Sequence, residues 1–94
     1  MNKREKETAA IYLSSCLYDM READIWKNAQ MKERAEKDWN QYRMRIKEML
    51  TMKFELFGLD DYEKTVIKPI QEIMKITQVF YGQRVNGQQL KYPA

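Results

Sequence analysis

The first 57 residues contain neither glycine nor proline. These two residues are the strongest helix breakers, so nothing in this stretch stops a long helix. The sequence therefore predicts an all-α protein whose breaks are concentrated toward the C-terminal end. The glycines and prolines are Gly58, Pro69, Gly82, Gly87 and Pro93.

Histidine is absent, and there is a single cysteine, Cys16. The commonest general base and metal ligand is therefore missing, and one cysteine forms neither an intrachain disulfide nor a zinc site. The three glycines are too widely spaced for a phosphate-binding loop. We expect no catalytic residues, no metal and no cofactor, and we expect that the protein is not an enzyme.

Long apolar runs are also absent, and no stretch approaches the ~20 apolar residues of a membrane-spanning helix. Residues 13–16 match a lipoprotein cleavage box, but the apolar run before them is too short for a signal peptide, and Glu5 and Glu7 precede it. The apolar neighbours of Cys16 favour a buried, unreactive thiol. We therefore expect a cytoplasmic protein with no membrane partner.

The chain is long enough for one domain, residues 1–94. It has 17 basic and 14 acidic side chains, and this small excess eases the approach of acidic partners without selecting among them. Seven methionines and six tyrosines supply much of the 44% of apolar residues, while leucine, isoleucine, valine and phenylalanine are scarce. Such a chain builds only a thin core, which favours oligomerisation or a standing partner.

Residues 1–7 are polar, and we expect them to fray, with Thr8 as a candidate helix cap. From residue 9 to residue 20, apolar positions recur at steps of three and four, as on one helical face. Ile11, Tyr18 and Ile25 add a second stripe beside that face. This helix is predicted to pack between two neighbours in the middle of the core.

Residues 19–24 are ambiguous. They either form a tight turn, with Asp24 capping the next helix, or belong to one uninterrupted helix. An unbroken helix over residues 8–57 would be exceptional in so short a chain, so we favour the break.

A heptad seam runs along the predicted long helix, residues 25–57. Apolar residues alternate at steps of four and three, with Lys53 filling one gap, which is typical of coiled-coil-like packing. After Ala35, we predict as the partner or oligomer seam Trp39, Tyr42, Ile46, Met49 and Leu56.

Trp26 falls off that seam, and it either packs under a turn or serves as an exposed binding anchor; we favour packing. Arg43 and Lys47 flank the seam on one side, and Arg45 flanks it on the other. We favour a solvated role for these three basic residues over contacts with phosphates. They and Trp26 are nevertheless the candidate partner or phosphate contacts.

Gly58 suits the left-handed position that ends a helix, and Asp60 and Asp61 then offer capping carboxylates. A dyad of these two acids for metal binding or catalysis is the less favoured reading. Pro69 either kinks one helix over residues 61–81 or lies in the first turn of a helix that begins at Lys68.

Gly82 is expected to stop the last helix, which leaves residues 82–94 as a loose tail or a small hairpin around Asn86-Gly87. The predicted fold is a three-helix arrangement built on a long central helix, as an antiparallel, coiled-coil-like hairpin with a short irregular or β-hairpin tail.

We expect a homo-oligomeric protein–protein interaction module that acts as an accessory regulator or inhibitor of a larger protein, of the kind that bacterial viruses make. The expected partners are a second copy and another protein. The alternative is a nucleic-acid-binding regulator that uses the basic flanks of the long helix.

Overall fold

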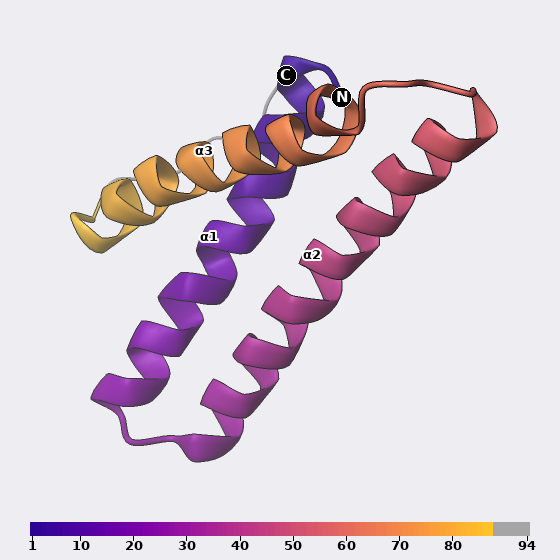
Figure 1. Cartoon of the computed structure of the whole chain (residues 1–94). Coiled ribbons are helices and arrows are strands. Elements are labelled where there is room, and N and C mark those ends of the chain that lie inside the picture. Colours follow the sequence, from indigo (N-terminus) through magenta and orange to yellow (C-terminus); the bar gives the residue numbers. More distant parts are fainter. Residues whose placement is uncertain (88–94) are drawn as a thin grey trace.

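Helices α1 and α2 form an antiparallel hairpin, and helix α3 crosses α1 (Figure 1). The computed structural model describes residues 1–87. Its elements are α1 (Lys3–Ile25), α2 (Ala29–Leu56), the π-helical turn η1 (Glu63–Ile67) and α3 (Lys68–Val85). The predicted all-α, three-helix fold is confirmed, and the described part of the chain contains no strand.

The N-terminal segment is helical. The Asn2 side chain accepts a hydrogen bond from the backbone N–H of Glu5 at 2.8 Å, and the Glu5 carboxylate accepts one from the N–H of Asn2 at 3.0 Å. This reciprocal capping box satisfies two backbone donors that a helix start leaves free. Residues 1–7, which we expected to fray, therefore contain the first turn of α1, and Asn2 rather than Thr8 is the cap.

The predicted break between the first two helices exists, but it lies at residues 26–28 rather than at residues 19–24. Lys27 adopts the left-handed conformation, with φ of 53°, and the N–H of Asn28 donates to the carbonyl oxygen of Ala23 at 2.8 Å. This six-to-one bond is the signature of a Schellman motif, which here ends α1 without a glycine.

Asn28, not Asp24, caps α2. Its side chain accepts a hydrogen bond from the backbone N–H of Met31 at 3.0 Å. Asp24 remains inside α1, where its carboxylate pairs with Lys32 of α2 at 2.8 Å. The helical register of α1 therefore continues past the acidic residues that we expected to end it.

The end of α2 is the one that the sequence predicts. Gly58 has φ of 60°, and the N–H of Leu59 donates to the carbonyl oxygen of Phe54 at 3.1 Å. This is a second Schellman motif, now with glycine at the left-handed position. Three residues further on, the Asp61 carboxylate accepts from the N–H of Lys64 at 3.0 Å, so its predicted capping role is confirmed.

Helix α3 begins at Lys68, and Pro69 lies in its first turn. The helical path is nevertheless continuous, because η1 leads directly into α3 and the N–H of Lys68 donates to the carbonyl oxygen of Glu63, five residues back. Proline has no N–H, so a change from π-helical to α-helical hydrogen bonding falls where one donor is missing.

Gly82 does not stop α3, which runs on to Val85 before the turn at Asn86 and Gly87. A glycine inside a helix weakens it by about 1 kcal/mol but does not forbid it. The predicted hairpin or loose tail falls largely on residues 88–94, which lie outside the described part of the chain.

One line of α1 residues meets α3. At one end of this line, the Lys6 ammonium contacts the Glu72 carboxylate at 2.5 Å; at the other, the Arg84 guanidinium lies 5.6 Å from the centroid of the Tyr18 ring. The two positions between them are fully buried and carry small side chains, which lets the helix axes approach closely. The line comprises Lys6, Ala10, Ser14 and Tyr18.

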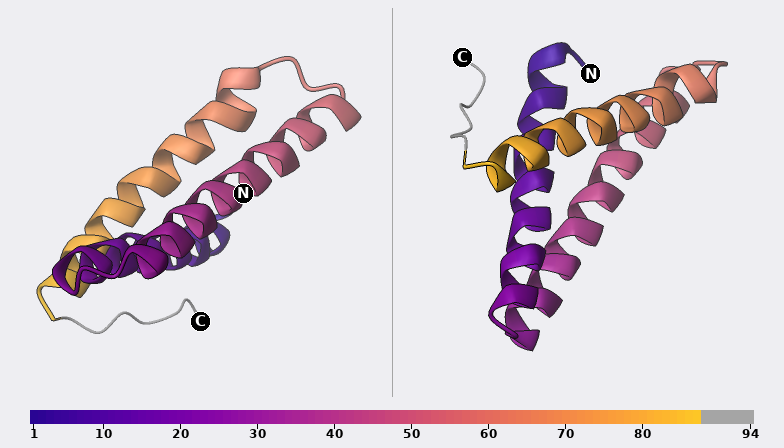
Figure 2. Two further views of the ribbon diagram at one scale, coloured as in Figure 1. Left: turned by 90° about the horizontal axis from the view of Figure 1, so that it is seen from below. Right: turned by 90° about the vertical axis from the view of Figure 1, so that its left-hand side faces the viewer.

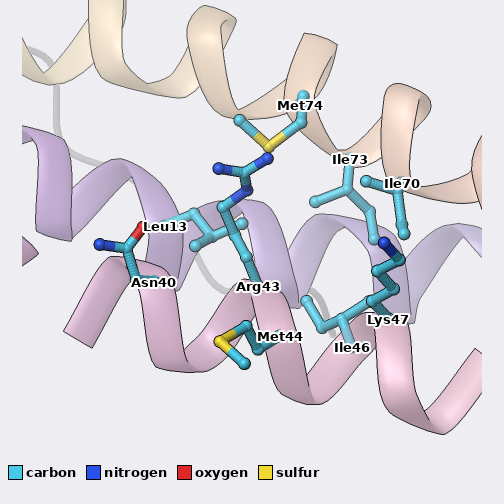
Figure 3. A pocket seen from close by; sticks show the side chains of 9 residues that line it. All are labelled: Leu13, Asn40, Arg43, Met44, Ile46, Lys47, Ile70, Ile73 and Met74. Carbon is cyan, nitrogen blue, oxygen red and sulfur yellow. The ribbon is translucent and has the colours of Figure 1, made fainter. Parts of the chain in front are cut away.

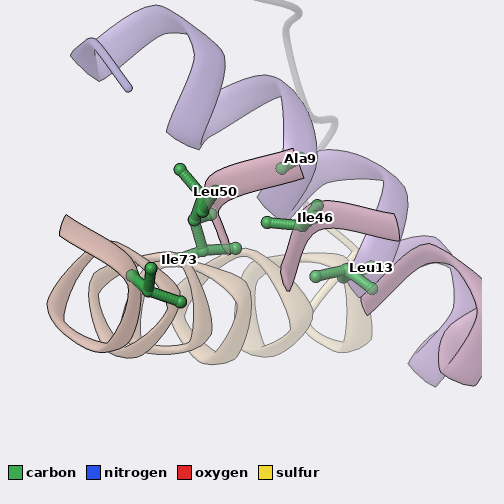
Figure 4. Close-up of a cluster of buried hydrophobic side chains, with 6 residues drawn as sticks. Ala9, Leu13, Ile46, Leu50 and Ile73 are labelled. Carbon is green, nitrogen blue, oxygen red and sulfur yellow. The ribbon is translucent and has the colours of Figure 1, made fainter. Parts of the chain in front are cut away.

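Helix α1 occupies the centre of the molecule, as predicted, with α2 along one side and α3 across another (Figure 2). Helix α3 reaches α2 mainly through η1, so these two helices splay apart away from the η1 end. The main apolar cluster contains residues of α1, α2, η1 and α3 (Figure 4). Its members are Ala9, Leu13, Ile46, Leu50, Val66 and Ile73.

Candidate functional site

An apolar groove lies between α2 and α3, with α1 beneath it, and it is named here the α2–α3 groove (Figure 3). It follows from the fold, because α2 and α3 diverge while both remain attached to α1 or η1. The groove encloses a cavity of about 290 Å³, close to the lower end of the ~300–1,000 Å³ of typical ligand sites. Its lining residues are Leu13, Asn40, Arg43, Met44, Ile46, Lys47, Ile70, Ile73 and Met74.

The floor of the groove is apolar and buried. Leu13 and Ile73 are each 1% exposed, and both belong to the main apolar cluster together with Ile46. Met74 lies half-buried on the α3 wall, and Met44, on the α2 rim, is 61% exposed. Unbranched methionine side chains adjust to the shape of a partner, so the groove combines a buried floor with an adaptable rim.

The charged residues of the groove are both basic. Arg43 and Lys47 extend from α2 over the groove toward α3 (Figure 3), and none of the lining residues from the described part of the chain is a carboxylate. The Arg43 guanidinium lies 5.5 Å from the centroid of the Trp39 ring, a cation–π contact that helps to hold it in place. The groove therefore suits an apolar group with a negative charge beside it.

A second surface, the acidic corner, consists of residues 55–63, where α2 ends and η1 begins. Four of its apolar side chains are exposed: Leu56 by 76%, Phe57 by 70%, Leu59 by 42% and Tyr62 by 37%. Large apolar side chains gathered in the open mark interaction surfaces in soluble proteins. The acids interspersed with them are Glu55, Asp60, Asp61 and Glu63.

Part of the predicted partner seam packs inside the chain. Ile46 belongs to the main apolar cluster, with Trp39 and Tyr42 against it, and the Tyr42 ring stacks on Tyr12 with a centroid separation of 4.3 Å. These three side chains therefore serve the α1–α2 contact. Only the last two seam residues are exposed, Met49 by 43% and Leu56 by 76%.

Our sequence reading missed Leu50, which is 2% exposed and takes the buried place that the heptad pattern assigns to Met49. Beyond Ile46 the buried side of α2 turns toward η1, where Phe54 packs edge-to-face on Tyr62 at 5.3 Å between centroids. The step of four from Ile46 to Leu50 was a signal for this shift, and it competed with an equally good step of three.

The other predicted contact residues are spread over separate surfaces. Trp26 is 75% exposed at the turn between α1 and α2, where its indole N–H donates to the Glu22 carboxylate at 3.0 Å, so the favoured packing under a turn was wrong. Arg45 lines a different cavity, beside Arg4 and Glu5 of α1. Arg43 and Lys47 thus do not form one basic stripe with Arg45.

The Cys16 thiol is buried, as predicted. Burial in apolar surroundings, with the Asp38 and Asp19 carboxylates nearby, raises its pKa to about 11. A thiol with so high a pKa stays protonated near neutral pH and is a poor nucleophile.

Among the described residues, no group of carboxylates and thiols is arranged to hold a metal ion. Within residues 1–87, no helix combines the length and apolar character that crossing a bilayer requires.

No protein-family model, curated protein or solved structure matches this chain.

Proposed function

We propose that this chain is a small protein–protein interaction module that self-associates, with the acidic corner of one copy seated on the α2–α3 groove of another. The observation that carries the proposal is the complementarity of these two surfaces in both polarity and charge. The groove has an apolar floor beneath Arg43 and Lys47, and the corner presents exposed apolar side chains among carboxylates.

The apolar parts supply the driving force. Leu56 and Phe57 are among the most exposed large apolar side chains of the described chain, and burying one such side chain contributes about 1.5–3 kcal/mol. The charges supply orientation more than affinity, because opposite potentials steer two surfaces into one register and penalise others.

Each copy carries both surfaces, which permits a reciprocal contact. Lys47 of the groove and Phe57 of the corner are ten residues apart, roughly 15 Å along α2. A two-fold axis that seats the corner of one copy on the groove of the other also brings about the reverse contact. Such an isologous dimer is the commonest closed assembly of soluble proteins.

The proposal includes the role that the sequence suggests, an accessory regulator or inhibitor of a larger protein, working in the cytoplasm. Nucleic-acid binding through Arg43, Arg45 and Lys47 stays a prediction, and the separate surfaces that hold these residues do not favour it.

Two charge-swap variants test the self-association by light scattering. R43E/K47E makes the groove rim acidic, and E55K/D60K makes the corner basic. Each variant alone should weaken association about tenfold or more, whereas an equimolar mixture should recover the mass of the wild-type assembly. Recovery requires that groove and corner meet, because the mixture restores only that pairing.

R34E/K37E is the matched control, since it makes the same change of charge near the start of α2, away from both surfaces. This control should associate as the wild type does. A wild-type chain that remains monomeric at high concentration would sink the proposal, and so would a mixture that stays dissociated.

A further inference from the structure

A second cavity, of about 390 Å³, lies where the start of α1, the C-terminal half of α2 and the junction of η1 with α3 meet. It is separate from the α2–α3 groove and shares no lining residue with it. The lining residues are Met1, Lys6, Leu50, Lys53, Lys64, Thr65, Lys68, Pro69 and Glu72.

Four of these residues are lysines, and they come from every element around the cavity. Lys6 belongs to α1, Lys53 to α2, Lys64 to η1 and Lys68 to α3. Of the residues that the structure describes, only one acidic side chain, Glu72, lines the cavity with them. Elements that are distant in sequence thus bring positive charges to one concave surface.

The negative charge of Glu72 is neutralised by an ion pair with Lys6. Its carboxylate accepts a hydrogen bond from the Lys6 ammonium at 2.5 Å, and this bond holds the pKa of Glu72 below its usual value. Within residues 1–87, the other three lysines of the cavity form no ion pair. The cavity therefore keeps three uncompensated positive charges.

The apolar wall of the cavity strengthens the attraction of these charges for anions. Leu50 is 2% exposed and Pro69 is also buried, so part of the cavity wall is apolar. Charges of one sign around a concavity with low-dielectric walls focus the field and concentrate counter-ions. Lysine ammonium groups bind phosphate as compact point charges, and Thr65 adds a hydroxyl at the wall.

We propose that this lysine cavity binds a small multivalent oxyanion, of the di- or triphosphate class. A compact anion fits because the lysines surround one cavity. A nucleic-acid backbone would instead call for a row of charges along one face of the molecule. The proposal is independent of self-association, since it uses none of the residues of the groove or the corner.

The test is titration calorimetry with inorganic tripolyphosphate at low ionic strength. K64Q/K68Q should weaken binding at least about tenfold, because it removes two of the three uncompensated charges. R34Q/K37Q removes the same net charge at the far end of α2 and should leave the affinity within about twofold of wild type.

The E72Q variant should gain affinity for tripolyphosphate rather than lose it. It removes the one acidic side chain of the cavity and frees Lys6, so tripolyphosphate should bind several-fold more tightly. An unfolded or damaged variant would not bind more tightly, which keeps this result separate from any effect on folding.

Three outcomes overturn the proposal. The first is no binding of tripolyphosphate to the wild type at millimolar concentration, and the second is equal weakening in K64Q/K68Q and R34Q/K37Q, which would indicate a response to net charge alone. The third is a single-stranded oligonucleotide that binds through Lys64 and Lys68 while tripolyphosphate does not, which would point to nucleic acid instead.

Discussion

Helices α1 and α2 are similar in length, but they are buried to different degrees. Seven of the 23 residues of α1 are buried, against three of the 28 residues of α2. The difference arises from the number of helices that each one contacts. Helix α1 packs on both α2 and α3, whereas α2 packs on α1 and η1 and makes few contacts with α3. A helix flanked on one side leaves apolar residues in the open, and α2 leaves Met44, Met52 and Leu56 exposed by 60% or more.

The largest expected effect comes from truncating the shared core. Leu13→Ala should lower the free energy of unfolding by about 2–5 kcal/mol, because Leu13 is 1% exposed and its loss leaves a cavity. Leu56→Ala, the same change on the exposed part of α2, should alter it by less than about 0.5 kcal/mol. Urea unfolding at low protein concentration measures both, and equal losses would contradict the one-sided packing of α2.

Overpacking the crossing of α1 and α3 should have the next largest effect. Ala10→Leu places a large side chain where the structure has no exposed surface, and we expect a loss of about 1–3 kcal/mol. Ala29→Leu is the matched control, since Ala29 is exposed in the first turn of α2 and the change there should be nearly neutral. If Ala10→Leu were tolerated equally well, the close approach of the two helices would be in doubt.

Burial of Cys16 on α1 predicts a loss of stability at high pH. The pKa of this thiol rises from about 9.0 to about 11 on folding, so the folded state holds the proton more tightly. Its contribution is therefore complete below pH 9 and is lost as the pH rises toward 11, on the order of 2 kcal/mol in all.

Unfolding midpoints over this pH range, for wild type and Cys16→Ala, measure the contribution. The variant should lose less stability than the wild type on going from pH 8 to pH 11, because it lacks the titrating group. Rapid modification of Cys16 by a thiol reagent in the native protein at pH 8 would contradict its burial.

Substitutions at the left-handed residues that flank α2, Lys27 and Gly58, should have the smallest effects on the free energy of unfolding, and these effects should have opposite signs. Gly58→Ala should destabilise by about 1 kcal/mol, because φ of 60° strains any residue with a Cβ, although the space around it is open. Lys27→Gly should stabilise by up to about 1 kcal/mol, since φ of 53° is already strained there. Changes of the same sign would show that backbone strain is not the deciding factor.

The sequence predicted the features that depend on neighbouring residues. The glycine stop at Gly58 and the cap at Asp61 were correct, since each needs only a left-handed residue or a carboxylate next to free backbone groups. Two other local features went unrecognised. The Asn2–Glu5 capping box was visible in its spacing, and Asn28 was passed over for Asp24.

The candidate site was less predictable. Trp39, Tyr42 and Ile46 were predicted as part of a partner or oligomer seam, whereas they pack within the chain. Periodicity does not encode whether a seam meets a partner or the same chain. The groove could not be predicted, because it joins Leu13, Lys47 and Met74 from three helices. Its shape depends on how far α2 and α3 splay apart, which no local pattern specifies.

By itself, then, the sequence determined that the chain is helical and roughly where its helices end, because hydrogen bonding and capping are settled within a few residues. The tertiary structure decided which apolar stripe is covered and where basic side chains gather around a cavity. Those outcomes depend on how α3 packs across α1, where Ala10 and Ser14 are fully buried, and this packing forms only after segments distant in the sequence have met.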